Sequence, residues 1–419
     1  MKYLGLSEFL AVIEGMIKNN VSEFEKEFAE YIGVKYALGT SYGRTALYIA
    51  LKAIDVEDKE VMVPAFTCSV VRDAICLAGA KPIFIDVNVD TLDMDISDIK
   101  KKLTEQTKVI IPTHYYGRPC GNIEQIIKLG RENNIIVLED CAHSLGAEYK
   151  NKKVGRFGNI SIFSLTKNTL NFQGGMIVTN DKELYIKAKN ILNKESKRTL
   201  LQKCSDFYSM LIYGYTSTVD KLVFDRINKS IFKWWLIKLP NILTALIKFL
   251  YYPIRKLRKQ RKEQMGFYQI NRNNLEHLKE MKTCLNLKMH PLIASVGRVQ
   301  LRKIDQINNK RIEISNKINT KLNLYYFKNI ESKDSKNVYA MLPMKFQNTN
   351  LDYIIRECKK EGLLLRKTWP AFQDWWEEQN TINVRKIRDS LLMWDVNPNV
   401  TDKEIKKMIS IIKKVLGDC

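Results

Sequence analysis

The sequence lacks the paired cysteines that mark most zinc-bound and disulfide-linked scaffolds. Its 8 cysteines are scattered singly, and no C-x-x-C pair occurs. Zinc ribbons need such pairs, and small secreted domains usually carry a regular cysteine framework. We therefore expect no metal site, and reduced thiols in a cytosolic protein, several of them buried in the core.

Long apolar runs and two nucleotide-binding fingerprints are also missing. No stretch reaches the roughly 18 uninterrupted apolar residues that a membrane-spanning helix needs. The opening MKYLGLSEFLAVIEGMIKNN has no apolar stretch followed by a small-residue cleavage site, so no signal peptide is expected. Neither G-x-G-x-x-G after the first predicted strand nor G-x-x-x-x-G-K-[ST] is present.

Acidic residues are too few to balance the basic ones. The 419 residues include 68 Lys and Arg against 46 Asp and Glu, a formal net charge of +22. This excess suits phosphorylated small molecules, nucleic acid or an anionic membrane, but lysines that simply cover solvated faces would give the same number. Because no zinc spacing or recognised binding motif accompanies the charge, we expect no nucleic-acid partner.

Residues 21–193 alternate short apolar runs with amphipathic stretches. This alternation predicts strands joined by crossover helices, and therefore a mostly parallel α/β sheet covered on both faces. Strands are predicted at the start of ALGTSYGRTALYIALKAI and in EVMVPA, KPIFIDV, KVIIPTHYYG, NIIVLED, ISIFSL and GGMIVTN. In such sheets ligands bind at the carboxyl ends of the strands.

The composition changes between residues 195 and 283. Residues 231–262 interleave aromatic and aliphatic residues with lysine and end in a dense basic run. The mixture suits an amphipathic element in a membrane interface, broken into short pieces by Pro240 and Pro253. An apolar face packed on the protein's own body or on a partner subunit would give the same pattern.

Ordinary globular patterning returns from residue 285. It includes the helical stretch PLIASVGRVQLRKIDQINNKRIEISNKIN and a closing amphipathic helix, DKEIKKMISIIKKVL, with Thr401 or Asp402 as its N-cap. We therefore predict a large domain (1–193), a basic and aromatic insertion (194–283) and a small C-terminal domain (284–419).

An acidic pair ends one predicted strand. In NIIVLEDCAHSLGA, Glu139 and Asp140 follow four apolar residues, where a carboxylate points into the ligand-binding crevice. Burial there is costly unless the acid meets a positive partner. The acid could instead cap the next helix, and His143 could be a hydrogen-bonded histidine without a chemical role.

A single lysine, Lys167, follows the strand ISIFSL. Desolvation at a strand end lowers the pKa of a lysine, and such an amine can form a Schiff base. Gly174 and Gly175 would let the backbone turn sharply and approach a flat ligand without Cβ clashes.

The stretch SYGRTAL (41–47) opens a predicted helix. Free N–H groups at a helix N-terminus, together with the hydroxyl of Thr45 and the guanidinium of Arg44, make a phosphate site. An ordinary helix cap is the alternative. The phosphate site, the strand-end acid and the strand-end lysine together describe binding of pyridoxal phosphate (PLP).

The sequence resembles the DegT/StrS-type family of PLP-dependent sugar aminotransferases, which share the aspartate aminotransferase fold (fold type I). The resemblance runs nearly end to end, and the order and spacing of its segments make it specific. The matching segments are SYGRTALYIAL, VMVPAFTCSVV, GAKPIFIDVNVDTLDMD, PTHYYGRPC, VLEDCAHSLGA, NLKMHPLIASVGRVQLRKID and LLMWDVNPNVTDKEIKKMI.

The resemblance implies a role for each candidate residue. Lys167 is the Schiff-base lysine and proton carrier, Asp140 pairs with the ring nitrogen of PLP, and His143 hydrogen-bonds its phenolic oxygen. The phosphate is expected at Arg44, Thr45 and Ser164. Cys68 stands over the cofactor ring, and Asn286 reaches the cofactor from a partner subunit.

Several positions depart from the family pattern. Relatives space the serine and lysine by two more residues than Ser164 and Lys167, and their G-E-G-G is FQGG here. Cys68 replaces an aromatic residue, and Arg44 replaces a threonine but can give the phosphate a charge-assisted contact.

The implied reaction is ping-pong transamination in a homodimer. Glutamate would donate the amino group and a nucleotide-linked keto-sugar would accept it, for surface polysaccharide or amino-sugar biosynthesis. One alternative is a catalytically reduced relative that acts as a membrane-associated binding or regulatory protein. A second alternative is sugar dehydration, but that variant of the family replaces the lysine with histidine, and position 167 here is a lysine. The expected location is the cytoplasm or the inner face of the membrane.

Overall fold

The computed structural model describes residues 6–169, 173–195, 288–324, 334–347, 349–367 and 381–417. The chain divides into two units, Met1–Arg198 with Glu280–Cys419, and Thr199–Lys279. The second unit lies outside the described residues. The same holds for the predicted membrane element (231–262), for Asn286, and for all but the first two residues of the predicted insertion.

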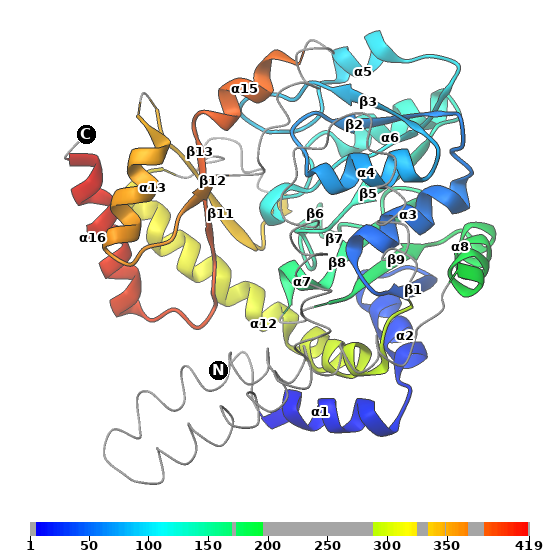
Figure 1. Cartoon of the computed structure of the whole chain (residues 1–419), viewed down its shortest axis with the longest axis horizontal. Coiled ribbons are helices and arrows are strands. Elements are labelled where there is room, and N and C mark those ends of the chain that lie inside the picture. Colours follow the sequence, from blue (N-terminus) through cyan, green and yellow to red (C-terminus); the bar gives the residue numbers. More distant parts are fainter. Residues whose placement is uncertain are drawn as a thin grey trace, which may run out of the picture. The chain divides into compact units, whose positions relative to one another are not determined.

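Seven strands form the central sheet, in the order β1-β9-β8-β5-β4-β2-β3 (Figure 1). Strand β9 is antiparallel to both of its neighbours, while the other pairs in the sheet are parallel. The strands are β1 (Tyr36–Thr40), β2 (Glu60–Pro64), β3 (Lys81–Ile85), β4 (Thr107–Ile110), β5 (Ile136–Asp140), β8 (Ile160–Ser164) and β9 (Gly175–Thr179). The predicted mostly parallel, seven-stranded sheet is confirmed.

Helices cover this sheet. The central one, α3 (Gly43–Ile54), is buried along nearly its whole length, because it packs against β1, β8 and β9 and against two other helices, α4 and α8. A helix that is apolar on all sides suits such a position. The others are α2 (Val21–Ile32), α4 (Ser69–Leu77), α5 (Ile96–Lys102), α6 (Ile123–Glu132), α7 (Leu165–Asn168), α8 (Lys182–Glu195) and the 3-10 turn η1 (Tyr115–Gly117).

The C-terminal part is built on a long helix and a small sheet. Helix α12 (Pro291–Leu322) packs against α1 (Leu6–Ile17), α2 and α16. The small sheet has the order β11-β13-β12, with β11 (Met341–Lys345), β12 (Arg366–Lys367) and β13 (Leu391–Asp395). The remaining helices are α13 (Leu351–Lys360), α15 (Ile382–Arg388) and α16 (Asp402–Gly417).

A short third sheet joins the two parts of the chain. It has the order β10-β6-β7, from β6 (Glu148–Tyr149), β7 (Lys152–Lys153) and β10 (Ser335–Lys336). Buried residues of the large sheet, α12 and the small sheet form one continuous hydrophobic core. A second core cluster lies between the sheet and α6, so β5, which carries Asp140, contacts both.

Two details refine the predicted elements. The N-cap of α16 is Thr401, whose Oγ1 accepts the Glu404 N–H at 3.3 Å while its own N–H donates to Glu404 Oε2 at 2.7 Å, as in a capping box. Helix α1 was not predicted. Among the described residues, no helix combines the length and the apolar character needed to cross a bilayer.

Candidate active site

A cavity of about 180 Å³ lies where the carboxyl ends of β5 and β8 meet the start of α3. Its walls include six of the eight residues predicted from the sequence. These are Arg44, Cys68, Asp140, His143, Ser164 and Lys167. The seventh, Thr45, does not line it, and Asn286 lies outside the described residues. Side chains from four separate segments therefore converge on one hollow.

Lys167 sits on α7, directly after β8. Its Nζ lies 2.7 Å from Nε2 of His143. The residue is exposed to the cavity, but its amine is surrounded by protein atoms. Desolvation is the main reason that its pKa lies below the ordinary lysine value; the charges of Arg366 and Arg44 act in the same direction, and Asp140 opposes them. A lowered pKa increases the share of neutral, nucleophilic amine.

Asp140 is the last residue of β5 and is 6% exposed. One carboxylate oxygen accepts the Ala142 N–H at 2.9 Å, which closes a turn; no helix begins there, so the alternative of a helix cap is wrong. Among the described residues, the other oxygen has no hydrogen-bond partner. Burial raises the pKa of Asp140, while the Ala142 N–H and the positive charge of Lys167 oppose the shift. The carboxylate is therefore suited to a cationic ligand atom.

His143 is 4% exposed and faces Lys167. Burial, followed by the charges of Lys167 and Arg366, holds the pKa of His143 well below its usual value. The ring is therefore neutral at neutral pH, and Nε2 can accept a hydrogen bond from the Lys167 ammonium. The ring of Tyr116 stacks on it, with centroids 5.9 Å apart and planes 11° from parallel.

The start of α3 forms one wall of the cavity. Its N-cap, Tyr42, is extended and makes no side-chain cap, and the first N–H groups of any helix lack partners within it. Arg44 is exposed, with its guanidinium carbon 5.1 Å from the centroid of the Tyr42 ring. Thr45 is fully buried and its Oγ1 lies 3.1 Å from Ser41 Oγ, in a pair in which either hydroxyl can donate.

Ser164 ends β8 on the opposite wall. Its Oγ lies 3.0 Å from Oγ1 of Thr166, another residue of the cavity. A Cβ at Gly43 would come within 2.9 Å of Ser164 Cβ, so the glycine permits the close approach of the two walls. The anion-binding candidates therefore lie on two elements that meet at a position with no side chain.

Gly174 and Gly175 act differently from the prediction. Gly174 has φ 115°, which confirms the sharp turn, and its N–H donates to Ser41 O at 2.6 Å. A Cβ at Gly175 would clash with the carbonyl of Tyr42. The group that approaches this backbone is therefore the Ser41–Gly43 turn, and the glycines position the N-terminus of α3.

A buried network lies under Asp140. Glu139 is fully buried, with both oxygens satisfied: Oε2 accepts from His114 Nε2 at 2.9 Å and from the Gly155 N–H at 3.0 Å, while Oε1 accepts from the N–H groups of Phe157 and Gly158 at 2.8 and 2.7 Å. His114 Nδ1 in turn accepts the Cys120 N–H at 2.9 Å. The acidic pair is thus divided between a structural and a site-facing carboxylate.

Three site residues were not singled out from the sequence. Tyr116 belongs to the quoted PTHYYGRPC segment, and its φ of 57°, unusual for a bulky residue, orients it toward His143. Thr166 adjoins Ser164. Arg366 comes from β12 and influences both Lys167 and His143 by its charge. Only Tyr116 had a sequence signal, because Arg366 is brought to the site by tertiary structure alone.

The fold and this cavity define the class of PLP-dependent transferases of fold type I. The model of the DegT/DnrJ/EryC1/StrS aminotransferase family matches residues 11–222 and 254–413. The chain belongs to this family, and the predicted family and fold class are confirmed.

Two relatives and one solved structure illustrate the similarity. GDP-perosamine synthase of Escherichia coli O157:H7 is 46% identical over 170 residues, which cover 40% of this chain and 46% of that one. The chain thus spans about half the length of that curated relative. The protein MJ1066 of Methanocaldococcus jannaschii is 30% identical over 70% of this chain and 74% of its own. Spr1654 of Streptococcus pneumoniae, in a structure titled the PLP form, has a TM-score of 0.72 at 17% identity, covering 99% and 97% of the two chains.

Proposed function

We propose that this protein is a PLP-dependent aminotransferase that moves an amino group from glutamate to a keto-sugar carried on a nucleoside diphosphate. The single observation that supports it most is the 2.7 Å contact between Lys167 Nζ and His143 Nε2, in the same cavity as Asp140. The name GDP-perosamine synthase supports the sugar as substrate class and agrees with the predicted type of enzyme. Surface polysaccharide or amino-sugar biosynthesis would use such a product.

The residues present fit PLP. The buried carboxylate of Asp140 keeps one oxygen without a partner among the described residues, as a protonated ring nitrogen requires. Arg44, the Thr45 N–H and Ser164 would hold the phosphate, and His143 the phenolic oxygen. When bound, PLP supplies an electron sink that stabilises negative charge at the carbon losing its proton.

The chain's own residues would manage the proton. Because its pKa is lowered, the Lys167 amine can take the proton from Cα of the amino donor and then donate it to the carbon that must gain a proton. Neutral His143 would hold the amine in place by accepting its hydrogen bond. Arg366 would keep the lysine's pKa low by its charge.

The decisive test is a half-reaction with glutamate. Purified protein given PLP should develop an absorbance band in the visible range and release 2-oxoglutarate when glutamate is added. Lys167→Ala should lose both, whereas Lys128→Ala, an exposed lysine elsewhere, should lose neither. A visible band that persists in Lys167→Ala would refute the assignment, and cofactor binding without 2-oxoglutarate would favour a catalytically reduced binding protein.

Three further predictions from the sequence belong to this proposal. We propose domain boundaries at 1–193, 194–283 and 284–419, a homodimer in which Asn286 of the partner subunit completes the site, and peripheral membrane contact through residues 231–262. The composition of 231–262 supports the last of these. Co-sedimentation with anionic liposomes that is unchanged after deletion of 231–262 would refute the proposed membrane contact.

A further inference from the structure

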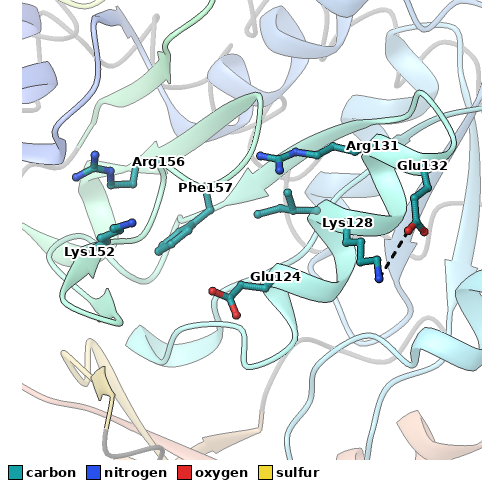
Figure 2. Close-up of a pocket in the computed structure, with 8 residues that line it drawn as sticks. Glu124, Lys128, Arg131, Glu132, Lys152, Arg156 and Phe157 are labelled. Atoms are coloured by element: carbon teal, nitrogen blue, oxygen red, sulfur yellow. Dashed lines mark ion pairs between the residues drawn. The ribbon is translucent and has the colours of Figure 1, made fainter.

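A second cavity, of about 550 Å³, lies between α6 and the loop that joins β7 to β8 (Figure 2). Helix α6 leads into the amino end of β5, and this loop leads into the amino end of β8. The candidate active site lies at the carboxyl ends of the same two strands. The two cavities are therefore separated by the length of a five-residue strand, roughly 16 Å.

Charges around this cavity are only partly paired. Glu124 bonds to Lys150 at 2.7 Å, and Lys128 lies 3.8 Å from Glu132. The other three charged lining residues are the cations Arg131, Lys152 and Arg156. Within the part of the chain that the structure describes, no carboxylate oxygen lies within 4 Å of these three cations.

The positions of these cations suit an anion in the hollow. Figure 2 shows the guanidinium of Arg131 extending from α6 toward Phe157, with Lys152 and Arg156 on the far side of that ring. The guanidinium of Arg156 lies beside Gly33, the residue that ends α2. All three side chains are exposed, so water can solvate their charges without an ionic partner. Their convergence around one hollow, rather than their charge alone, is the specific feature.

One wall of the cavity is apolar. Ile127 and Phe157 are half-buried in it, and the Phe157 ring meets Tyr149 at 6.0 Å with the planes 72° apart, which holds it in place. A flat ring stacks on such a wall, whereas phosphate groups prefer the planar donors of arginine and the ammonium of lysine. The volume is also in the range of small-molecule sites.

We infer that this cavity binds a nucleoside diphosphate, free or as the head of a nucleotide-linked sugar, as a second site separate from the active site. The base lies against Phe157 and Ile127, and the diphosphate lies among Arg131, Lys152 and Arg156. This site does not depend on the proposed reaction, because none of its residues lines the candidate active site.

Titration calorimetry of the full-length protein loaded with PLP, with GDP and then inorganic pyrophosphate as probes, tests the inference. The variant pair R131Q/K152Q should weaken GDP binding at this site at least tenfold. The matched control K100Q/K101Q removes two exposed positive charges from the last turn of α5 and should bind as the wild type does. Phe157→Leu keeps the charge and should weaken GDP several-fold, with pyrophosphate unaffected.

Each other outcome overturns the inference in a distinct way. Equal GDP binding by R131Q/K152Q and K100Q/K101Q would show that GDP occupies the active site only. Equal affinity for GDP and pyrophosphate, with no effect of Phe157→Leu, would show a simple phosphate site. These measurements need no turnover, so a failure of the transaminase assay would leave their result intact.

Discussion

At the scale of single residues, Asp140 shows how a site residue can cost stability. Burial raises its pKa in the folded protein, so the folded state binds this proton more tightly than the unfolded chain does. Its contribution to stability therefore falls as the pH rises through the window between the unfolded and folded pKa values. Above that window the ionised carboxylate destabilises the cofactor-free protein.

Asp140→Asn should therefore separate stability from activity. We expect the cofactor-free variant to melt about 1–2 °C higher than the wild type at pH 7, a difference that disappears below about pH 4. The glutamate half-reaction should fall at least about 100-fold, because the amide cannot keep the ring nitrogen protonated. Calorimetry and single-turnover absorbance measure the two effects. Asp58→Asn, at an exposed site, is the control, and a fall in melting temperature at pH 7 would contradict the account.

Arg366 offers a second test at this scale. Its charge lowers the pKa of Lys167, so Arg366→Gln should raise that pKa and slow the labelling of Lys167 by an amine reagent at pH 8. Because Arg366 is exposed, we expect a two- to threefold effect at low ionic strength, about the size of a surface interaction, and less in high salt. Peptide mass spectrometry measures the rate. Arg356→Gln, on the exposed face of α13, should leave the rate unchanged.

The sequence predicted most of the candidate residues because their neighbours carried a pattern. Lys167 and Asp140 each follow an apolar run that had to be a buried strand, and a parallel sheet brings such ends together. The phosphate contact of Thr45 stays a prediction, with its hydroxyl 3.1 Å from that of Ser41. The sequence does not point to Arg366, because nothing near it in the chain distinguishes it from the other 67 of the 68 Lys and Arg residues.

At the scale of elements, Glu139 links β5 to the loop before β8. Its pKa is lowered although burial opposes the shift, because bonds from His114, Gly158 and Gly155 outweigh the desolvation. The stability it provides is present above the unfolded pKa and is lost as the pH falls through the folded one. Glu139→Gln should cost about 2–4 kcal/mol at pH 7, since its NH₂ would face existing donors. Urea unfolding should show that this loss of stability becomes smaller below about pH 4. Glu124→Gln is the exposed control.

The contact between β9 and the start of α3 gives another test of an element. Gly175→Ala should push the Tyr42 carbonyl aside and displace the N–H groups at the start of α3. We expect a loss of about 1–3 kcal/mol in stability, as overpacking costs, and at least tenfold weaker PLP binding by fluorescence titration. Gly417→Ala, where no atom lies within 4 Å, is the matched control. Unchanged PLP affinity in Gly175→Ala would argue against a phosphate at this turn.

The elements themselves were largely predictable, with instructive exceptions. The strands and helices between residues 21 and 193 have clear hydrophobic periods in the sequence, and the structure contains them. The sequence predicts that Gly174 and Gly175 approach a ligand, because it cannot show that the Ser41–Gly43 turn packs there. The sequence pattern does not predict helix α1, because apolar residues also stand on its exposed side, at Leu10, Ile13 and Ile17.

At the scale of the whole molecule, the proposed dimer makes a quantitative prediction. If Asn286 acts in the site of the partner subunit, Lys167→Ala and Asn286→Ala remove different subunits' contributions to one site. Random mixing of the two inactive variants should then restore about a quarter of the wild-type activity, because half of the dimers are hybrids with one complete site. Activity after refolding the mixed chains measures this. No recovery, with dimers confirmed by light scattering, would place Asn286 in its own subunit's site or outside the reaction.

The architecture of the whole chain was predictable only through its resemblance to a family. Alternation of strands and helices predicts a parallel sheet, but not its order or the reversed direction of β9. Those depend on which strands pair over long distances in the sequence, a property that local patterns do not contain. The joining of both sheets by one core is likewise a tertiary result.

One isolated β-bridge between distant segments has an evolutionary consequence. Lys288 pairs with Thr40 through a single antiparallel bridge, immediately before the Ser41–Gly43 turn. Because Asn286 lies two residues before Lys288, recombination that exchanges the chain between α8 and this bridge would conserve the proposed chemistry only if it conserved that asparagine. The bridge at Thr40 therefore gives any such exchange a fixed point of return, and the proposed role of Asn286 gives it a second constraint.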